Sequence, residues 1–238
     1  MLAAHRLESV ENSHEPFHRP VRKSTDTCSD AVARLAAFAT PLWHPKGAAL
    51  FAEGQPPRGV FILYSGRVKL FTSSADGRAR ILKFAGPGEI LGLAGTLSGQ
   101  PYEAWAEAIQ PAQTGFVERT YLVQLIRRHC DLATHVAMQL GESYYSAIAG
   151  VRAMGCLRSA RQKLATFLLD WCGNDRPACD ETSARLTLTH EEISQVIGTS
   201  RETVTRLLSG FKAKGLIQWR GCNLILTDRV ALESSAAN

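Results

Sequence analysis

The fold is decided by residues 188–211, which read LTHEEISQVIGTSRETVTRLLSGF. Thr189 is a good helix N-cap, and Glu192 three residues later completes a capping box, in which each side chain bonds the backbone N–H of the other residue. Gly198 ends such a helix at little cost because glycine readily adopts the left-handed backbone conformation. The pattern predicts a short helix that begins after Thr189 and ends before Gly198.

A second helix is predicted directly after the first, with Ser200 as its N-cap. Its apolar side chains recur at helical spacing and face inward: Val204, Leu207, Leu208 and Phe211. The opposite face is polar and carries Arg201, Glu202, Thr205, Arg206 and Ser209. A solvated amphipathic helix is the alternative interpretation, but two short capped helices joined by a glycine turn are typical of a helix-turn-helix.

The polar face of this second helix suits the reading of DNA. Arginine donates two hydrogen bonds to guanine, and glutamate accepts one from the cytosine amino group. These residues occupy the first turns, which enter the major groove, whereas Lys212, Lys214 and Arg220 can meet phosphates. The sequence therefore predicts binding to double-stranded DNA through a recognition helix at residues 200–214, with these contacts: Thr189, Thr199, Ser200, Arg201, Glu202, Thr205, Arg206 and Lys212.

Short strands and turns are predicted on the N-terminal side, between residues 41 and 116. Apolar runs at 59–64, 67–71 and 80–84 are separated by turn residues, among them Asp76-Gly77. This spacing predicts a small β-barrel or roll, preceded by a short helix around residues 29–40 and a flexible tail at 1–27. On the C-terminal side we expect an amphipathic helix at 164–171, a polar loop at 172–185 and a hairpin at 216–227.

A long helix is predicted between these two regions. Apolar or small residues recur from residue 131 onward at steps of four and three: Leu132, Val136, Leu140, Tyr144, Ala147, Val151 and Met154. Such a stripe either packs on its own domain or pairs with a second copy of the chain. Its length and its place between two domains favour a dimer seam.

The composition is that of a globular protein of one large or two ordinary domains, with 238 residues, 45% hydrophobic and 21% charged. The net charge of +5 is compatible with a polyanionic partner. No apolar run approaches the roughly 18–20 residues of a membrane span, and the N-terminus lacks the order of a signal peptide. We therefore expect a cytoplasmic protein without a membrane partner.

Metal and catalytic chemistry find little support in the sequence. The six cysteines form no CxxC pair, so we expect free thiols, although Cys172 and Cys179 can meet in one loop region. We find no nucleophile–base set, phosphate loop or metal-ligand cluster. The sequence therefore predicts no catalytic residues, no metal site and no enzyme.

Residues 188–207 closely resemble the DNA-binding motif of the Crp–Fnr family of bacterial regulators, most specifically in Ser200-Arg-Glu-Thr-Val-x-Arg206. The resemblance covers nearly the whole chain after the tail. It implies an α+β fold with a cyclic-nucleotide-binding-type jelly roll (a β-roll sensor) at 28–130, a dimerisation helix at 131–158 and a winged helix-turn-helix at 159–238. It also implies a homodimer in which Arg201, Glu202 and Arg206 read two half-sites of a near-palindrome, and RNA polymerase as a partner.

The sensor departs from the cyclic-AMP-binding pattern of this family. Gly92 is kept, but Leu93 replaces a glutamate, and Tyr102 and Glu103 stand where an Arg-Ser pair would hold the phosphate. Ile148 replaces a hydroxyl residue that would reach the base. We take Gly92, Leu93, Tyr102, Glu103 and Ile148 as the candidate effector pocket, expect no cofactor, disfavour cyclic AMP, and leave the small-molecule effector unnamed.

Other sensing chemistries of the family have partial support at most. The oxygen-sensing branch needs a cysteine cluster near the N-terminus, where only Cys28 lies. Haem needs axial ligands, for which His44, His129 and His135 are candidates. A cyclic-nucleotide-responsive module that acts through protein partners is the rival function, and the Arg-Glu-x-x-x-Arg face argues against it.

Overall fold

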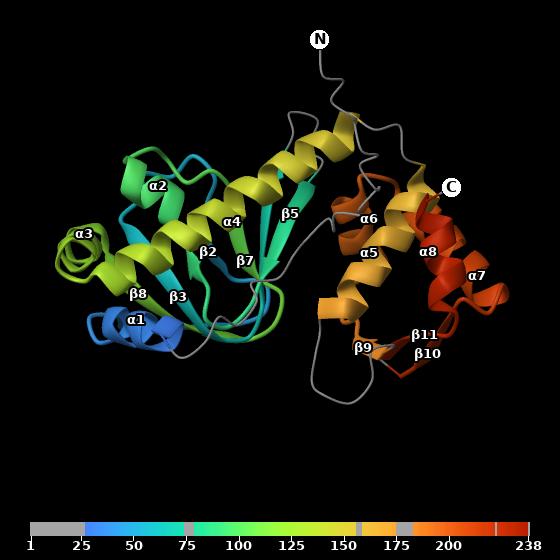
Figure 1. The fold of residues 1–238 in the computed structure, drawn as a ribbon, viewed down its shortest axis with the longest axis horizontal. Coiled ribbons are helices and arrows are strands. Elements are labelled where there is room, and N and C mark those ends of the chain that lie inside the picture. The colour runs from blue at the N-terminus through green and yellow to red at the C-terminus, as the bar shows by residue number, and fades with distance from the viewer. Residues whose placement is uncertain (1–26, 74–78, 156–158, 175–182, 222, 238) are drawn as a thin grey trace, which may run out of the picture.

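The computed structural model describes residues 27–73, 79–155, 159–174, 183–221 and 223–237. The predicted tail, except Thr27, and the Asp76-Gly77 turn lie outside these residues. The chain forms an N-terminal β-roll and a C-terminal helical unit with a small sheet, connected along the long helix (Figure 1). This arrangement confirms the predicted α+β class, with a roll followed by a winged helix-turn-helix.

The roll consists of two four-stranded antiparallel sheets. The first has the order β1 (Thr40–His44), β8 (Ala112–Glu118), β3 (Gly59–Ser65) and β6 (Ile90–Leu91), and the second has β2 (Ala49–Phe51), β7 (Trp105–Ala108), β4 (Val68–Ser73) and β5 (Ala79–Ala85). Successive side chains of a strand point to opposite faces. On β3, Phe61 and Leu63 therefore join the core between the sheets, while Val60 and Ile62 join a second core beneath the helices.

Helices cover the outer face of the first sheet. They are α1 (Thr27–Ala36), α2 (Leu93–Ser98), α3 (Arg119–Arg128) and the first half of α4 (Cys130–Gly155). Ala31 and Leu35 of α1 lie in the same buried cluster as residues of α4. Figure 1 shows α4 crossing the roll and continuing toward the C-terminal unit.

The apolar stripe predicted along the long helix faces the roll in its first half. Leu132 and Val136 are buried in the core beneath the helices, and Leu140 packs against it. The prediction that Leu132 and Val136 meet a second copy is therefore wrong, and packing on their own domain is the correct interpretation for them. Leu140 is only partly buried and Tyr144 and Ala147 are exposed, so for these residues the seam stays a prediction. A different stripe at steps of four and three lies on the other side of α4: Thr134, Met138, Gly141, Tyr145 and Ile148.

The C-terminal unit contains α5 (Ala160–Asn174), β9 (Ser183–Arg185), α6 (His190–Ile197), α7 (Arg201–Ala213), β10 (Ile217–Arg220), β11 (Asn223–Leu226) and α8 (Arg229–Ala237). The β10–β11 pair confirms the expected hairpin. The polar loop predicted at 172–185 is wrong at both ends, because α5 continues to Asn174 and Ser183–Arg185 forms a third strand paired with β11. Residues 175–182 of that loop lie outside the described part.

The two units contact each other at what we term the domain junction, formed by Arg67, Ile81 and Phe84 of the roll and Trp171 of α5. Phe84 meets Trp171 edge-on at 5.5 Å between ring centroids, and the Arg67 guanidinium lies 4.9 Å from the Trp171 ring centroid. Ile81 belongs to the same apolar cluster as the C-terminal core. Among the described helices, none is long and apolar enough to cross a membrane.

Candidate nucleic-acid interface

The caps expected for α6 are present. The Thr189 hydroxyl accepts a hydrogen bond from the Glu192 backbone N–H at 3.1 Å, and the Glu192 carboxylate accepts one from the Thr189 N–H at 2.8 Å. Gly198 has φ 68° and ends the helix in the left-handed conformation. The capping box therefore fixes where α6 starts, and the glycine fixes where the chain turns toward α7.

The next helix, α7, begins at its own cap and is held by its apolar face. The Ser200 hydroxyl accepts from the Thr203 N–H at 3.2 Å. Val204, Leu208 and Phe211 are buried in the C-terminal core. Because these three side chains fix the rotation of the helix, the opposite face is directed outward.

The outward face of α7 brings most of the predicted contacts together. Its side chains Arg201, Glu202, Thr205, Arg206, Ser209 and Lys212 are all exposed, as are the caps Thr189 and Ser200, while Thr199 is half-buried. Figure 1 shows α7 on the side of the C-terminal unit remote from the roll. The face is therefore open to a molecule that approaches from solvent.

The charges on this face suit a polyanion that presents both hydrogen-bond acceptors and hydrogen-bond donors. Three of its residues are cationic, namely Arg201, Arg206 and Lys212, and only Glu202 is acidic. The pKa of the Glu202 carboxyl lies below its ordinary value, first because its own backbone N–H donates to it and then because the Ser200 hydroxyl does. Glu202 is therefore a carboxylate, which accepts hydrogen bonds, at neutral pH.

Sequence reasoning missed His190, the first residue of α6. Its Nδ1 lies 2.9 Å from the Thr205 hydroxyl oxygen, and that hydroxyl is also 3.0 Å from the Arg201 carbonyl oxygen. The sequence does show a polar ring directly after the Thr189 cap, at the start of the first helix. A side chain in that place can border the second helix. His190 thus links α6 to the outward face of α7.

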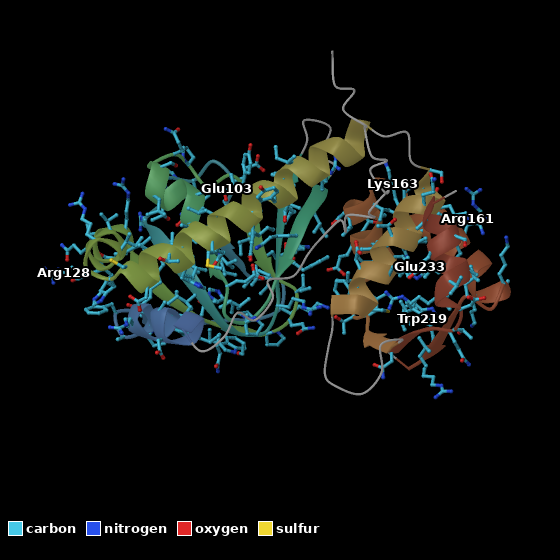
Figure 2. The ribbon with its side chains drawn as sticks, in the orientation of Figure 1. Glu103, Arg128, Arg161, Lys163, Trp219 and Glu233 are labelled. Atoms are coloured by element: carbon cyan, nitrogen blue, oxygen red, sulfur yellow. The ribbon has the colours of Figure 1, made fainter. Side chains whose placement is uncertain are left out.

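Further cationic and aromatic residues border the helix-turn-helix on α5 and β10. Figure 2 labels Arg161 and Lys163 on α5 and Trp219 on β10. The Arg161 guanidinium lies 5.6 Å from the Phe211 ring centroid, which ties the start of α5 to the buried face of α7. The exposed Arg220 ends β10, as expected for a residue of the hairpin.

The candidate effector residues are only partly brought together. Gly92 has φ +80°, and a Cβ there would lie 2.7 Å from Cε1 of Tyr102, so the two residues are in direct contact. Leu93 is buried beneath the helices. Glu103 is exposed on the roll surface (Figure 2), and Ile148 is half-exposed on α4, outside this contact.

Tyr102 occupies the interior of the roll. Its ring stacks on Phe51 at 4.2 Å between centroids, within a core that also holds Phe61 and Phe116, and its hydroxyl donates to the Gly59 carbonyl at 2.6 Å. Burial raises the pKa of Tyr102, so the phenol is neutral at ordinary pH. An aromatic ring with a satisfied hydroxyl therefore occupies this part of the roll interior.

The basic residues of neighbouring strands have partners of their own. Lys69 pairs with Glu107 at 3.0 Å, and Lys83 pairs with Glu89. Arg67 lies over Trp171 at the domain junction. These three side chains are therefore engaged in contacts other than with a phosphate group.

The histidines and cysteines form no cluster among the residues that the structure describes. Within that part, no group of three or more His, Cys, Asp or Glu side chains can hold a metal ion. His44 bonds the Thr114 hydroxyl at 2.9 Å, and burial lowers its pKa. Cys130 is an exposed free thiol and Cys172 is buried, whereas Cys179 lies outside the described residues.

Two family models match this chain, and together they span both units. Residues 41–129 match a cyclic nucleotide-binding domain, and residues 162–235 match a Crp-like helix-turn-helix domain. A CRP-like cAMP-activated global transcriptional regulator of Mycobacterium tuberculosis is 28% identical over 217 residues, which are 87% of this chain and 92% of that protein. Electron transport regulator A of Shewanella oneidensis is 26% identical, over 81% of this chain and 77% of that protein.

Solved structures give the same correspondence. The structure of FixK2 from Bradyrhizobium japonicum matches with a TM-score of 0.73 at 26% identity, over 84% of this chain and 98% of that one. The match spans the roll, the long helix and the C-terminal unit together. The order of domains is thus shared with a solved relative.

Proposed function

Since this chain belongs to the Crp–Fnr family of DNA-binding transcriptional regulators, we propose that it reads a near-palindromic operator as a homodimer, with one α7 in each half-site. Its relatives are transcriptional regulators rather than enzymes. The observation that carries the proposal is the exposed Arg201–Glu202–Arg206 face on a doubly capped helix-turn-helix. Two-fold symmetry of the protein matches two-fold symmetry of the operator.

Each residue of this face has a chemically distinct role in the proposal. Arg201 and Arg206 donate paired hydrogen bonds to guanine, and Glu202 accepts from a cytosine amino group. Lys212, one turn beyond Leu208, holds a phosphate and adds affinity without sequence preference. The half-site therefore contains at least one G·C pair that α7 reads directly.

The exposed stripe of α4 supports the homodimer. Met138 and Tyr145 are more than half exposed in the single chain, although both carry large apolar groups. With Thr134, Gly141 and Ile148 they form the four–three spacing of a coiled-coil seam. Gly141 has open space around the position of a Cβ, which lets a second helix approach closely. The stripe becomes buried when two copies of α4 pair.

Cyclic AMP is not the effector in this proposal, although relatives are named as cAMP-activated. A cyclic phosphate carries a full negative charge, and its burial requires a positive partner or several donors. Tyr102 is neutral with its proton committed to Gly59, and Lys69 and Lys83 are paired with carboxylates. The effector is a neutral or aromatic molecule, or the regulator acts without one. RNA polymerase is the partner through which DNA binding alters transcription.

Selection of bound sequences from random duplex DNA, followed by band-shift titration, tests the function. We expect a two-fold symmetric consensus, bound much more tightly than random DNA at the same salt concentration. Equal affinity for all sequences contradicts the proposal. Calorimetry with cyclic AMP in the same buffer is expected to show no binding at micromolar concentration, and binding that raises operator affinity would contradict the effector part alone.

A further inference from the structure

The ring of Tyr102 fills part of the core between the two sheets of the roll. It is buried and stacks on Phe51 with 4.2 Å between ring centroids, and the same core holds Phe61 and Phe116. The domain that residues 41–129 match is named for binding a small molecule. In this chain, a side chain of the protein itself provides an aromatic ring in the interior of that domain.

This ring lies directly on the backbone at Gly92. Gly92 is the N-cap residue of α2 and has φ +80°, and a Cβ there would lie 2.7 Å from Cε1 of Tyr102. Glycine is the residue that combines a left-handed backbone with so close an approach. The Tyr102 hydroxyl is fixed as well, because it donates to the Gly59 carbonyl at 2.6 Å, to which the Thr96 hydroxyl also donates at 2.7 Å. The ring therefore contacts one backbone position in a fixed orientation.

The short segment around Gly92 connects the interior of the roll with α4. Leu91, before the glycine, packs in the same core as the tyrosine ring, whereas Leu93, after it, belongs to the core that buries the first half of α4. Ile90 is held by α4 directly, because the Gln139 amide bonds both its N–H and its carbonyl. A shift of the backbone at Gly92 is therefore transmitted to α4, the helix that leads to the C-terminal unit.

We infer that Tyr102 is an internal ligand of the roll: its ring holds segment 90–93 and α4 in the arrangement that binds DNA, as a bound aromatic molecule would. This inference rests on the proposed function and adds its regulation, because the roll then needs no diffusible effector while the ring is in place. A ligand shifts a protein toward the state that it contacts best. A ring that is part of the chain does so at all times.

The experiment removes the ring and returns it as a free molecule. Tyr102→Ala deletes the hydroxyphenyl group, and phenol is that group as a separate compound. A cavity left in an apolar core can bind such an aromatic molecule. We expect Tyr102→Ala to bind the operator about tenfold more weakly than the wild type, within the usual range of coupling between sites. Phenol should restore most of this affinity as its concentration rises, and should leave the wild type unchanged.

Two variants separate this role from a general loss of stability. Leu70→Ala removes apolar volume from the same core, but from β4 in the second sheet, whereas β6 and the segment that follows it belong to the first sheet. It should bind the operator as the wild type does, with or without phenol, at a temperature at which circular dichroism shows both proteins folded. Tyr102→Phe keeps the ring and should keep the affinity, because the Gly59 carbonyl still accepts from Thr96.

Hydrogen exchange at Ile90 measures the coupling without DNA. Its amide donates to the Gln139 side chain, so its exchange rate reports how firmly α4 holds this segment. Exchange should be faster in Tyr102→Ala than in the wild type, and phenol should slow it again. Leu70→Ala should exchange as the wild type does.

The outcomes distinguish this inference from the proposed function. Operator affinity of Tyr102→Ala that equals the wild type, or that phenol does not restore, overturns the inference and leaves the function intact. The same holds if Leu70→Ala loses as much affinity, because core volume rather than this ring then matters. Absence of any preferred sequence in the selection removes the proposed function, and Ile90 exchange that phenol leaves unchanged would then remove the coupling as well.

Discussion

In the proposed function, single side chains of α7 divide into those that read bases and those that hold phosphates, and the dependence of affinity on salt concentration separates the two roles. Arg206→Ala is expected to cost about 1–3 kcal/mol on the operator, because it removes a paired hydrogen bond to guanine, and to leave random DNA nearly unaffected. Fluorescence anisotropy on operator and random duplexes measures both. Equal losses on the two duplexes would assign Arg206 to phosphate binding.

Lys212 gives the opposite expectation at the same scale. Lys212→Ala should weaken operator and random DNA alike, because a phosphate contact is independent of sequence. The slope of log affinity against log salt should fall by about 0.9 for each phosphate that the protein no longer neutralises. A series from low to moderate salt measures this slope. A change of preferred sequence in Lys212→Ala would show that it reads a base.

The lowered pKa of His44 predicts how the unfolding free energy changes as the pH falls. Burial lowers its pKa, and its ring bonds the Thr114 hydroxyl across the β1–β8 pair. A group with a lowered folded-state pKa prefers its neutral form in the fold, so its contribution is complete above the unfolded pKa near 6.5 and is lost as the pH falls. We expect the unfolding free energy to decrease between pH 7 and pH 5, as measured by urea denaturation.

The matched variant is His44→Gln, in which the side chain at position 44 no longer titrates. Its stability should fall less over the same interval. His135, whose pKa burial also lowers, is present in both proteins and therefore cancels in the comparison. Identical pH dependence of the two proteins would show that the pKa of His44 is the same in the folded and the unfolded chain.

Among the elements, α4 is joined to the roll by one side chain as well as by apolar packing. The Gln139 amide donates to the Ile90 carbonyl at 2.6 Å and accepts from the Ile90 N–H at 3.2 Å. Gln139→Leu leaves two buried backbone groups of β6 without this partner, at a cost of about 1–3 kcal/mol for each. Urea denaturation is expected to show this loss. Ser143→Ala, which removes only a bond within α4, should stay within about 0.5 kcal/mol of wild type.

The exposed stripe of α4 makes a separate prediction about assembly. Tyr145→Asp places a charge in the proposed seam, where burial without a partner costs several kcal/mol. Light scattering should show monomers with an unchanged helical circular dichroism spectrum. Tyr121→Asp introduces the same change at an exposed tyrosine of α3, outside the stripe, and should remain dimeric. A dimeric Tyr145→Asp would exclude this face as the seam.

Local signals made some elements predictable and left others out of reach. The caps of α6 and α7 depend on residues at most four positions apart, so the sequence alone located Thr189 and Ser200. The roll-facing side of α4 depends on which surface covers Leu132 and Val136, and spacing cannot supply that. Strand β9 was missed because its three residues become a strand only by pairing with β11. Likewise, the sequence placed Tyr102 in the candidate effector pocket, but did not show that its ring lies against Gly92.

In the molecule as a whole, the domain junction sets how the C-terminal unit is held on the roll. A dimer on its operator needs the two α7 helices about 34 Å apart, and a fixed junction lowers the entropy cost of meeting both half-sites. Phe84→Ala removes the ring that meets Trp171. We expect weaker binding to the full operator and unchanged binding to a single half-site.

Leu82→Ala is the control for the junction variant. Leu82 lies on the same strand, two residues before Phe84, but is 41% exposed and lies outside the junction. It should bind both duplexes as the wild type does. If Phe84→Ala retains full affinity for the complete operator, the junction does not set the spacing of the recognition helices.

The pairing of β1 with β8 also orders events in time while the chain is being synthesised. His44 and Thr114 are 70 positions apart, and α1 finds its partner only when α4 has been made. At roughly 5–20 residues per second, the ribosome takes on the order of ten seconds to make the strand that β1 needs. During that interval Leu35 and the strand edge have no native cover. The helix-turn-helix, by contrast, forms contacts between near neighbours and can fold soon after it emerges. The part of the roll synthesised first is therefore among the last parts of the roll to be buried, and a nascent chain stopped before Ala112 should require a chaperone to remain soluble.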